Sequence, residues 1–329
     1  MQWDNLPLHL PDTRLNKGTM DKITGLHHIT AISGNAKKNY DFYTRVMGLR
    51  FVKKTVNFDD PHTYHFYYGD ETGTPGTILT FFPWEDISAG RRGTHMATEV
   101  GYSIPEGSID FWLKRLEKEN IIYNKPSSKF GEVYLTFIDP DGLKVELTVP
   151  DKPDPRTPWT TKEVTEEYAT RGFHHVTLTL EEVQPTADLL VSVFGYQLVK
   201  HHTNRYRFAS PAGETANFID LVEAKGEPRG HVAGGSVHHI AFRMKDDAMQ
   251  QHYRQLLEDR GLNATPQLDR KYFRSVYFRE PGGVLFELAT DTPGFTVDEP
   301  AAELGTHLML PPQFEPQREE IIKKLIKLD

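Results

Sequence analysis

Three pairs of adjacent histidines, each at the start of an expected strand, are the residues most able to do chemistry. They are His27-His28, His174-His175 and His238-His239. Two glutamates, Glu146 and Glu287, close the two halves of the chain in matching contexts. Neutral imidazoles and a carboxylate on neighbouring strands can hold a divalent metal with open coordination positions, as in non-haem iron(II) oxygen chemistry. We therefore expect function to lie at these histidines and glutamates.

The composition limits what such a site can be. Cysteine is absent from the 329 residues, which excludes disulfides, thiolate nucleophiles and sulfur-ligated metals, so any metal is held by nitrogen and oxygen. The 46 acidic and 38 basic residues include no long basic run, so no nucleic-acid partner is expected. No apolar stretch reaches the roughly 20 residues that span a bilayer, and the first 20 residues lack an apolar secretory segment. We expect no membrane partner and a cytoplasmic location.

The chain is an internal duplication. Gly25 matches Gly172 at a step of 147 positions, and Glu146 matches Glu287 at a step of 141. A proline-rich stretch between the halves reads as a linker. The predicted organisation is an N-terminal extension (1–22), a first domain (23–150), a linker (151–170), a second domain (171–292) and a C-terminal tail with a short helix (293–329).

Each half divides again into two units of strand, helix and three strands. In the first unit, Asn35 is positioned to cap a helix that Gly48 ends, and strands are predicted at 51–57, 64–68 and 77–82. In the second unit, a helix is predicted at 109–119. A unit of this kind leaves a curved sheet with one apolar face, and two of them together make an open barrel with an interior cleft. The predicted fold class is α+β, with four βαβββ modules forming two open barrel-like halves.

A short amphipathic helix is predicted near the C-terminus. Its apolar face consists of Ile321, Ile322, Leu325, Ile326 and Leu328. Such a face packs on the body of the protein or on a second subunit of a homo-oligomer.

Several phrases, taken in order, resemble one known family. They are Leu26-His27-His28-Ile29-Thr30, Arg50-Phe51-Val52-Lys53-Lys54-Thr55, Tyr64-His65, Gly73-Thr74-Pro75-Gly76-Thr77, Val237-His238-His239, Asp269-Arg270, Tyr277-Phe278-Arg279 and Phe286-Glu287. Each is weak alone, but in this order they are strong, and the resemblance covers the chain from about Ile23 to Pro312. The chain resembles the vicinal oxygen chelate superfamily, and within it the bacterial dioxygenases that open the rings of hydroquinones.

This resemblance implies one iron(II) ion, with Mn(II) or another divalent metal as alternatives. The implied ligands are His28, His239 and Glu287. The groups implied for acid-base work or substrate orientation are His27, Thr30, His238, Arg270 and Tyr277. The implied partners are a small aromatic diol and O₂.

Spacing alone leaves one ligand ambiguous, because His28 and His175 hold the same place in their repeats. If the units pair within halves, His175 joins His239 and Glu287. If the first unit pairs with the fourth, His28 joins them instead. The resemblance favours His28, which makes His175 a remnant of duplication and Glu146 an echo without metal. In the first half, the stretch aligned with His238-His239 reads Ala97-Thr98-Glu99, so the first half alone cannot supply the ligand set.

Plainer interpretations exist for each group. A single histidine on a strand is more often a satisfied polar residue than a ligand, and His62, His65, His201 and His202 have too little context for any role. Arg270 and Tyr277 are equally well explained as a surface ion-pair partner and a core aromatic. The repeated pairs matched to a repeated glutamate favour a metal site.

The expected chemistry is extradiol-type opening of a hydroquinone- or catechol-type diol by O₂, with His238 or Tyr277 moving the hydroxyl proton and Arg270 orienting the anionic substrate. One rival is a glyoxalase-like metal-dependent lyase or isomerase on the same scaffold. The other is a non-catalytic protein that binds and sequesters an aromatic compound. A lyase or isomerase would consume no oxygen, which distinguishes it from a dioxygenase. A sequestering protein need bind no metal, which distinguishes it from both enzymes.

Overall fold

Four modules of one β-α-β-β-β plan follow one another along the chain. In this computed structural model, residues 8–11 and 21–328 are described, so the predicted extension at 1–22 falls partly outside them. The first module contains β1 (Leu26–Ser33), α1 (Ala36–Asp41) continued by the π-helical turn η2 (Phe42–Val46), β2 (Arg50–Asn57), β3 (Asp60–Gly69) and β4 (Ile78–Pro83). The second contains β5 (Met96–Ser103), α2 (Ile109–Lys118), β6 (Ser127–Lys129), β7 (Glu132–Ile138) and β8 (Lys144–Val149).

The second half repeats this order. The third module contains β9 (Phe173–Leu180), α3 (Gln184–Ser192), β10 (Gln197–His202), β11 (Arg205–Ala209) and β12 (Phe218–Glu223). The fourth contains β13 (Ser236–Met244), α4 (Asp247–Glu258), β14 (Leu268–Asp269), β15 (Arg274–Arg279) and β16 (Leu285–Thr290). The tail ends in α5 (Arg318–Lys324). The predicted α+β fold of four βαβββ modules is thus confirmed.

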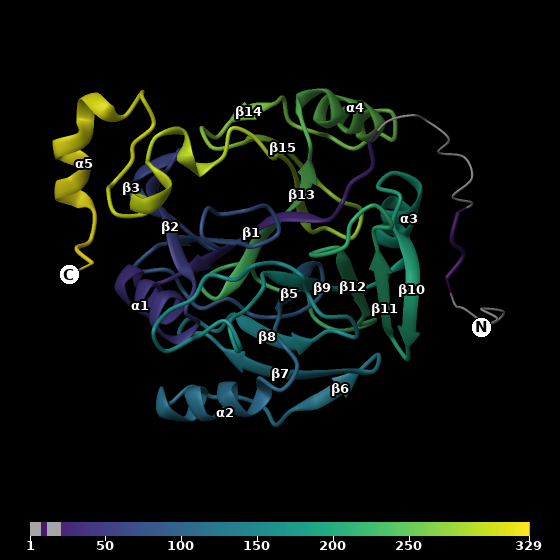
Figure 1. The fold of residues 1–329 in the computed structure, drawn as a ribbon. Coiled ribbons are helices and arrows are strands. Elements are labelled where there is room, and N and C mark those ends of the chain that lie inside the picture. The colour runs from purple at the N-terminus through teal and green to yellow at the C-terminus, as the bar shows by residue number, and fades with distance from the viewer. Residues whose placement is uncertain (1–7, 12–20, 329) are drawn as a thin grey trace.

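The modules pair across the two halves of the sequence. One eight-stranded sheet has the order β14-β15-β16-β13-β1-β4-β3-β2, which joins the first module to the fourth. The other has the order β10-β11-β12-β9-β5-β8-β7-β6, which joins the second to the third. In Figure 1, the purple β1 lies beside the green β13 near the centre of the molecule. Because each sheet draws on both halves, the domain boundaries predicted at 150 and 171 describe the repeat and stay a prediction.

Local sequence explains where the first helix begins and ends. The Asn35 side chain accepts a hydrogen bond of 2.8 Å from the backbone N–H of Lys38, as a helix N-cap does. Gly48 has φ +68°, a left-handed conformation that favours glycine after a helix, and a Cβ there would press on Val164. The capping prediction is therefore confirmed.

The C-terminal helix packs on the body through part of its apolar face. Ile321 and Leu325 are buried in a cluster with Val56 and Leu310, whereas Ile322 is 51% exposed. In Figure 1 this helix is the yellow element at one edge, close to β2 and β3. Across the described part of the chain, each helix is too short or too polar to cross a bilayer.

Candidate metal centre

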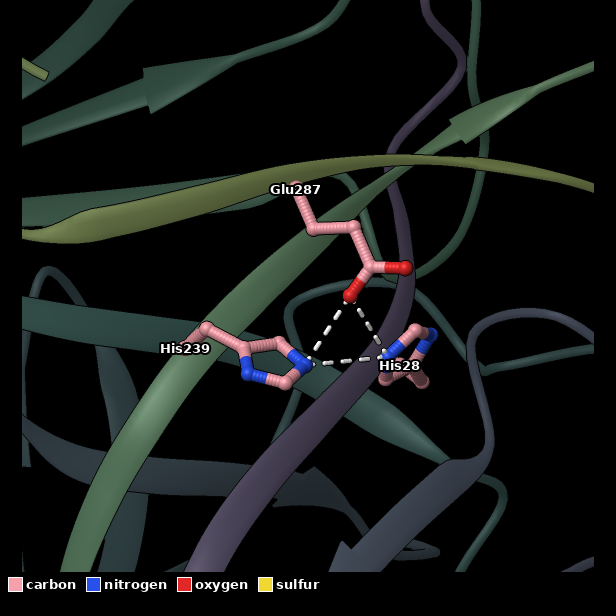
Figure 2. Close-up of side chains that lie close together, drawn as sticks. All are labelled: His28, His239 and Glu287. Atoms are coloured by element: carbon pink, nitrogen blue, oxygen red, sulfur yellow. Dashed lines mark hydrogen bonds and ion pairs between the residues drawn. The ribbon is translucent and has the colours of Figure 1, made fainter. Parts of the chain in front are cut away.

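Three buried side chains from three adjacent strands meet at one point. His28 comes from β1, His239 from β13 and Glu287 from β16. Nε2 of His28 lies 3.2 Å from Oε2 of Glu287 and 3.4 Å from Nε2 of His239, and Nε2 of His239 lies 2.9 Å from the same oxygen. Figure 2 shows the carboxylate reaching down between the two rings. The structure therefore brings His28, and not His175, to His239 and Glu287.

The electrostatics of this trio suit a cation. Oε2 of Glu287 is buried and has no hydrogen-bond donor of acceptable geometry among the described residues. Burial lowers the pKa of His239. Burial would raise the pKa of Glu287, but His28 and His239 together hold it well below its usual range. Neutral imidazole and ionised carboxylate are the forms that bind metal, and a buried carboxylate without a counter-ion is costly.

Bulged strands explain why the histidines come in adjacent pairs. Neighbouring residues on a regular strand point to opposite faces, but the register between β1 and β13 shifts twice. The extra residue is His27 at one shift and His238 at the other. A bulge re-aims the side chains around it. Each first histidine of a pair is therefore free to turn toward the ring that follows it.

His27 and His238 contact the candidate ligands at Nδ1, the ring nitrogen that lies away from the metal position. Nδ1 of His27 lies 2.9 Å from Nδ1 of His28, and Nδ1 of His238 lies 2.8 Å from Nδ1 of His239. Such a bond fixes the ring and leaves Nε2 facing the metal position. Burial, with the neighbouring His239, lowers the pKa of His238 to about 3. The His238 side chain is therefore neutral at physiological pH, and it contacts His239 through a hydrogen bond between the two rings.

A narrow cavity opens onto the trio. Of the residues predicted for acid-base work, Thr30, Arg270 and Tyr277 line this cavity, whereas His27 and His238 lie against the ligand rings. The lining residues are His28, Thr30, Asn57, Phe58, Asp59, His65, Tyr67, Phe82, His239, Arg270, Phe273 and Tyr277. The combination of aromatic walls with a few polar groups is typical of a small-molecule site.

Arg270 and Tyr277 act together at one side of the cavity. The Arg270 guanidinium carbon lies 5.6 Å from the centre of the Tyr277 ring, and its Nη2 lies 3.3 Å from Oδ2 of Asp59. The Tyr277 ring in turn packs edge-on against His239. Burial and the charge of Glu287 raise the pKa of Tyr277, although Arg270 opposes them. At neutral pH this residue is therefore a phenol that can donate a proton.

A hydrogen-bonded chain in the cavity wall includes a residue that sequence reasoning set aside. His65 on β3 lies 2.9 Å from the Tyr67 hydroxyl through Nδ1 and 2.9 Å from Oγ1 of Thr80 through Nε2. Thr80 then donates to Oγ1 of Thr30, also at 2.9 Å. Because Thr80 donates onward, it accepts from Nε2–H of His65. The hydroxyl proton of Thr30 is left available to the cavity.

A strand register would have revealed His65. His65 and Tyr67 are two positions apart, so they share a face of β3. Tyr67 pairs with Thr80 on β4, and Thr80 pairs with Thr30 on β1. The phrase Tyr64-His65 was part of the family resemblance, but without the register nothing connected it to Thr30.

We expect Thr80→Val to lower kcat roughly two- to tenfold, the effect of losing one hydrogen bond that positions Thr30. The fold should be kept, because valine has nearly the shape of threonine. Steady-state turnover measures this effect. Thr55→Val is the matched control: Thr55 is also fully buried, and its hydroxyl has no hydrogen-bond partner in the described chain. Equal turnover for the two variants would show that the hydrogen bonds from His65 through Thr80 to Thr30 do not contribute to the reaction.

The other sheet holds a second cluster of the same design. Glu99, Glu146 and His175 each offer a ligand atom within 4.8 Å of the others, and all three are buried. Sequence reasoning aligned the stretch Ala97-Thr98-Glu99 with His238-His239 but did not consider Glu99 as part of a cluster. The pairing of β5 with β9 and β8 brings these residues together.

Comparison with known proteins agrees with the fold and the site. The model of the Glyoxalase/Bleomycin resistance protein/Dioxygenase superfamily matches residues 25–147 and 172–288. The chain is 46% identical over 310 residues to the "Putative ring-cleaving dioxygenase MhqO" of Bacillus subtilis (strain 168), covering 94% of this chain and 97% of that one. It is 35% identical over 313 residues to the "Chlorohydroquinone/hydroquinone 1,2-dioxygenase" of Sphingobium indicum, covering 93% and 97%.

Solved structures give the same result. A crystal structure described as a "putative dioxygenase" from Bacillus subtilis matches with a TM-score of 0.90 at 45% identity, over 94% of this chain and 99% of that one. Glyoxalase I from Zea mays matches with a TM-score of 0.63 at 14% identity, over 86% and 97%, and shares the fold. The family match spans both repeats, including the strands that carry His28, His239 and Glu287. The chain belongs to the glyoxalase, bleomycin resistance protein and dioxygenase superfamily, and its relatives include proteins named as ring-cleaving dioxygenases.

Proposed function

We propose that this protein is an iron(II)-dependent dioxygenase that opens the ring of a hydroquinone-type diol with O₂. The observation that carries the proposal is the meeting of two imidazole nitrogens and one carboxylate oxygen within 3.4 Å at the base of an aromatic cavity. Two histidines and a carboxylate with open positions are the ligand set of non-haem iron(II) oxygenases.

His28, His239 and Glu287 would hold the metal. Iron(II) there would supply a redox-active ion with positions open to a diol oxygen and to O₂. His27 and His238 keep the two ligand rings in the tautomer that presents Nε2, through the bonds between Nδ1 atoms. The ligand trio is buried, and His28 and His239 line the cavity.

The cavity walls would bind and orient the ring. Phe58, Phe82 and Phe273 offer apolar surface on which an aromatic ring packs. Arg270 lies where it can stabilise the negative charge of a deprotonated ring hydroxyl. Tyr277 holds a proton that it can donate to an oxygen of the reacting substrate, and Thr30 offers a second hydroxyl donor.

The choice of a 1,4-diol rests on the relatives. The similar Sphingobium protein is named for hydroquinone and chlorohydroquinone. In a diol of this kind, one hydroxyl would lie beside His28, His239 and Glu287, and the other would lie across the ring. In extradiol-type cleavage, the bond between the metal-side hydroxyl carbon and its neighbour breaks, and both atoms of O₂ enter the product.

We expect chelation to abolish activity and anaerobic reconstitution with iron(II) to restore it, because three protein ligands alone cannot activate O₂. The measurement is oxygen uptake with hydroquinone and, separately, catechol, together with bound iron per chain. Uptake should be one O₂ per ring opened and higher with hydroquinone. Metal-loaded protein that consumes no oxygen with any dihydroxybenzene, but isomerises a thiol adduct with nickel or zinc, would show a glyoxalase-type enzyme instead.

A further inference from the structure

The second sheet reproduces the metal centre position by position. In the first sheet, Ala241 on β13 pairs with both His28 and Glu287. In the second, Gly101 on β5 pairs with both His175 and Glu146. The third ligand position follows as well: Thr30 pairs with His239, and Thr177 pairs with Glu99. His175, Glu99 and Glu146 therefore stand where His28, His239 and Glu287 stand.

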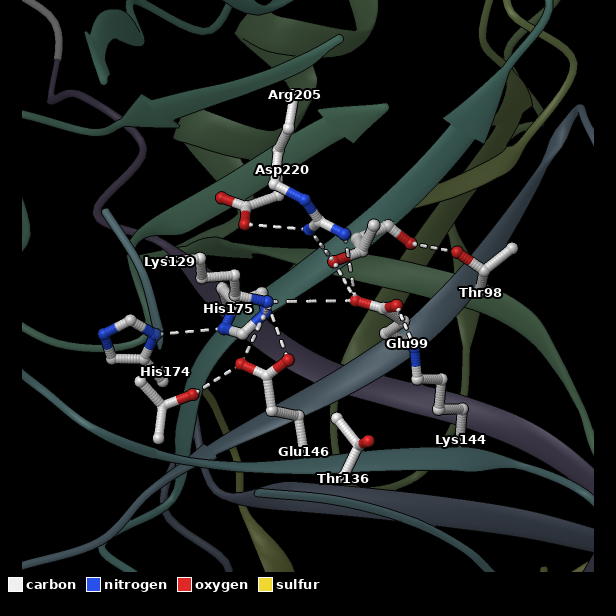
Figure 3. A network of polar contacts seen from close by, with 12 residues as sticks. Thr98, Glu99, Lys129, Thr136, Lys144, Glu146, His174, His175, Arg205 and Asp220 are labelled. Atoms are coloured by element: carbon white, nitrogen blue, oxygen red, sulfur yellow. Dashed lines mark hydrogen bonds and ion pairs between the residues drawn. The ribbon is translucent and has the colours of Figure 1, made fainter. Parts of the chain in front are cut away.

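A lysine ammonium fills the point on which these groups converge. Nζ of Lys129 lies 2.6 Å from Oε2 of Glu146, 3.4 Å from Nε2 of His175 and 3.9 Å from Oε2 of Glu99. Figure 3 shows this ammonium among the three side chains, with dashed lines to Glu99 and Glu146. These atoms are the counterparts of the atoms that meet in the first sheet. The side chain thus lies where the other sheet has its candidate metal position.

The matching residue of the first sheet is Arg270. Lys129 and Arg270 differ by the same 141 positions as Glu146 and Glu287. The residues just before them also pair alike: Ser128 pairs with Val133 in the second sheet, and Asp269 pairs with Arg274 in the first. Arg270 instead stacks on Tyr277 and reaches Asp59. At equivalent positions, therefore, the first sheet has an arginine that lies away from the centre and the second has a lysine that fills it.

We propose that Lys129 is a built-in replacement for the metal ion of the second sheet, so that the natural chain holds one divalent ion and not two. Without this ammonium, His175, Glu99 and Glu146 form a site of one imidazole and two carboxylates for a divalent cation such as Mn²⁺. Only the count of one in the natural chain rests on the proposed function of the first centre.

The charge balance around Lys129 supports this assignment. Glu99, Glu146, Asp220 and Glu132 contact four cationic side chains, which are Lys129, Lys144, Arg205 and Arg207. Burial would raise the pKa of Glu99, but Arg205, Lys144 and Lys129 lower it to about 2. Removal of one ammonium leaves the cluster with a buried negative charge in excess, which a metal ion can compensate.

The cluster meets an open cleft at Glu99. That cleft is lined by Thr98, Glu99 and Lys144, among others. Carboxylate oxygens with one imidazole are ligands that Mn²⁺ accepts. What excludes the metal is the occupied position and the neutralised charge.

The test is the number of Mn²⁺ ions bound per chain, measured by equilibrium dialysis and electron paramagnetic resonance. Lys129→Met removes the charge and keeps most of the side-chain volume. We expect one ion in the natural chain and two in Lys129→Met. His239→Ala disables the first centre. We expect no bound ion in the His239→Ala variant and one bound ion in the double variant His239→Ala with Lys129→Met. That background separates the two proposals, because the second site gains its ion whether or not the first centre binds any.

Lys144→Met is the matched control. Its ammonium contacts Glu99 at 2.6 Å, so the variant removes an equal charge from the same cluster but leaves Lys129 in place. It should bind no additional ion. If Lys129→Met folds poorly without metal, Lys129→Gln takes its place. The midpoint of thermal unfolding is then measured in the His239→Ala background, where Mn²⁺ should raise the midpoint of the Lys129 variant. Two ions in the natural chain, or no additional ion and no thermal shift in either Lys129 variant, would overturn the proposal.

Discussion

His28→Ala should lose its bound iron and lower ring-cleaving turnover by roughly a thousandfold or more. This is the effect of losing about 4 kcal/mol of transition-state stabilisation, within the several kcal/mol that a bound metal contributes. Nε2 of His28 is one corner of a triangle whose other corners are 2.9 Å apart. Its removal leaves two ligands, which hold a divalent ion weakly. Bound iron per chain and oxygen uptake with hydroquinone measure the effect.

His175→Ala is the matched control for that variant. His175 has the same place in its repeat and is equally buried, but it lies with Glu146 and Lys129 in the other sheet. We expect iron content and turnover close to the natural protein, and a loss of stability of roughly 1–3 kcal/mol from the broken polar cluster. Denaturant unfolding measures that loss. If His175→Ala lost iron while His28→Ala kept it, the centre would have been assigned to the wrong histidine.

The pairing of modules explains why spacing left that choice open. The repeat predicts four strand-helix-three-strand units, because strand alternation and a capped helix are local signals such as Asn35 and Gly48. Which units share a sheet depends on contacts such as that of Thr30 with His239, more than 200 positions apart in the chain. No local propensity encodes such a contact. The family resemblance supplied it, and the sheet order agrees with it.

The residues around the ligands were harder to predict than the ligands themselves. His27 and His238 were expected to do acid-base work or to orient substrate, and two bulges place their rings against the ligand rings. A bulge is a change in register between strands, which a single strand sequence does not show. Lys129 lies on a three-residue strand and reaches its cluster through a long side chain. In the sequence it is one lysine among many.

Tyr277→Phe should lower kcat by about a hundred- to ten-thousandfold, the range for loss of a positioned proton donor. Burial and Glu287 raise the pKa of Tyr277, so the hydroxyl carries its proton at neutral pH. Phenylalanine keeps the ring that packs on His239 and lies beneath Arg270. We therefore expect iron content and KM to change little. Single-turnover oxygen consumption by iron-loaded protein isolates the affected step from product release.

Tyr134→Phe separates that chemical effect from the general effect of removing a tyrosine hydroxyl. Tyr134 lies in the second sheet beneath Lys129, whose Nζ is 4.7 Å from the ring centre, much as Tyr277 lies beneath Arg270. Its removal should leave kcat and iron content unchanged. If Tyr277→Phe kept full turnover as well, the donated proton would come from Thr30 or from water. If Tyr277→Phe instead raised KM with kcat unchanged, the hydroxyl would bind substrate and transition state equally, and its role would be recognition without proton donation.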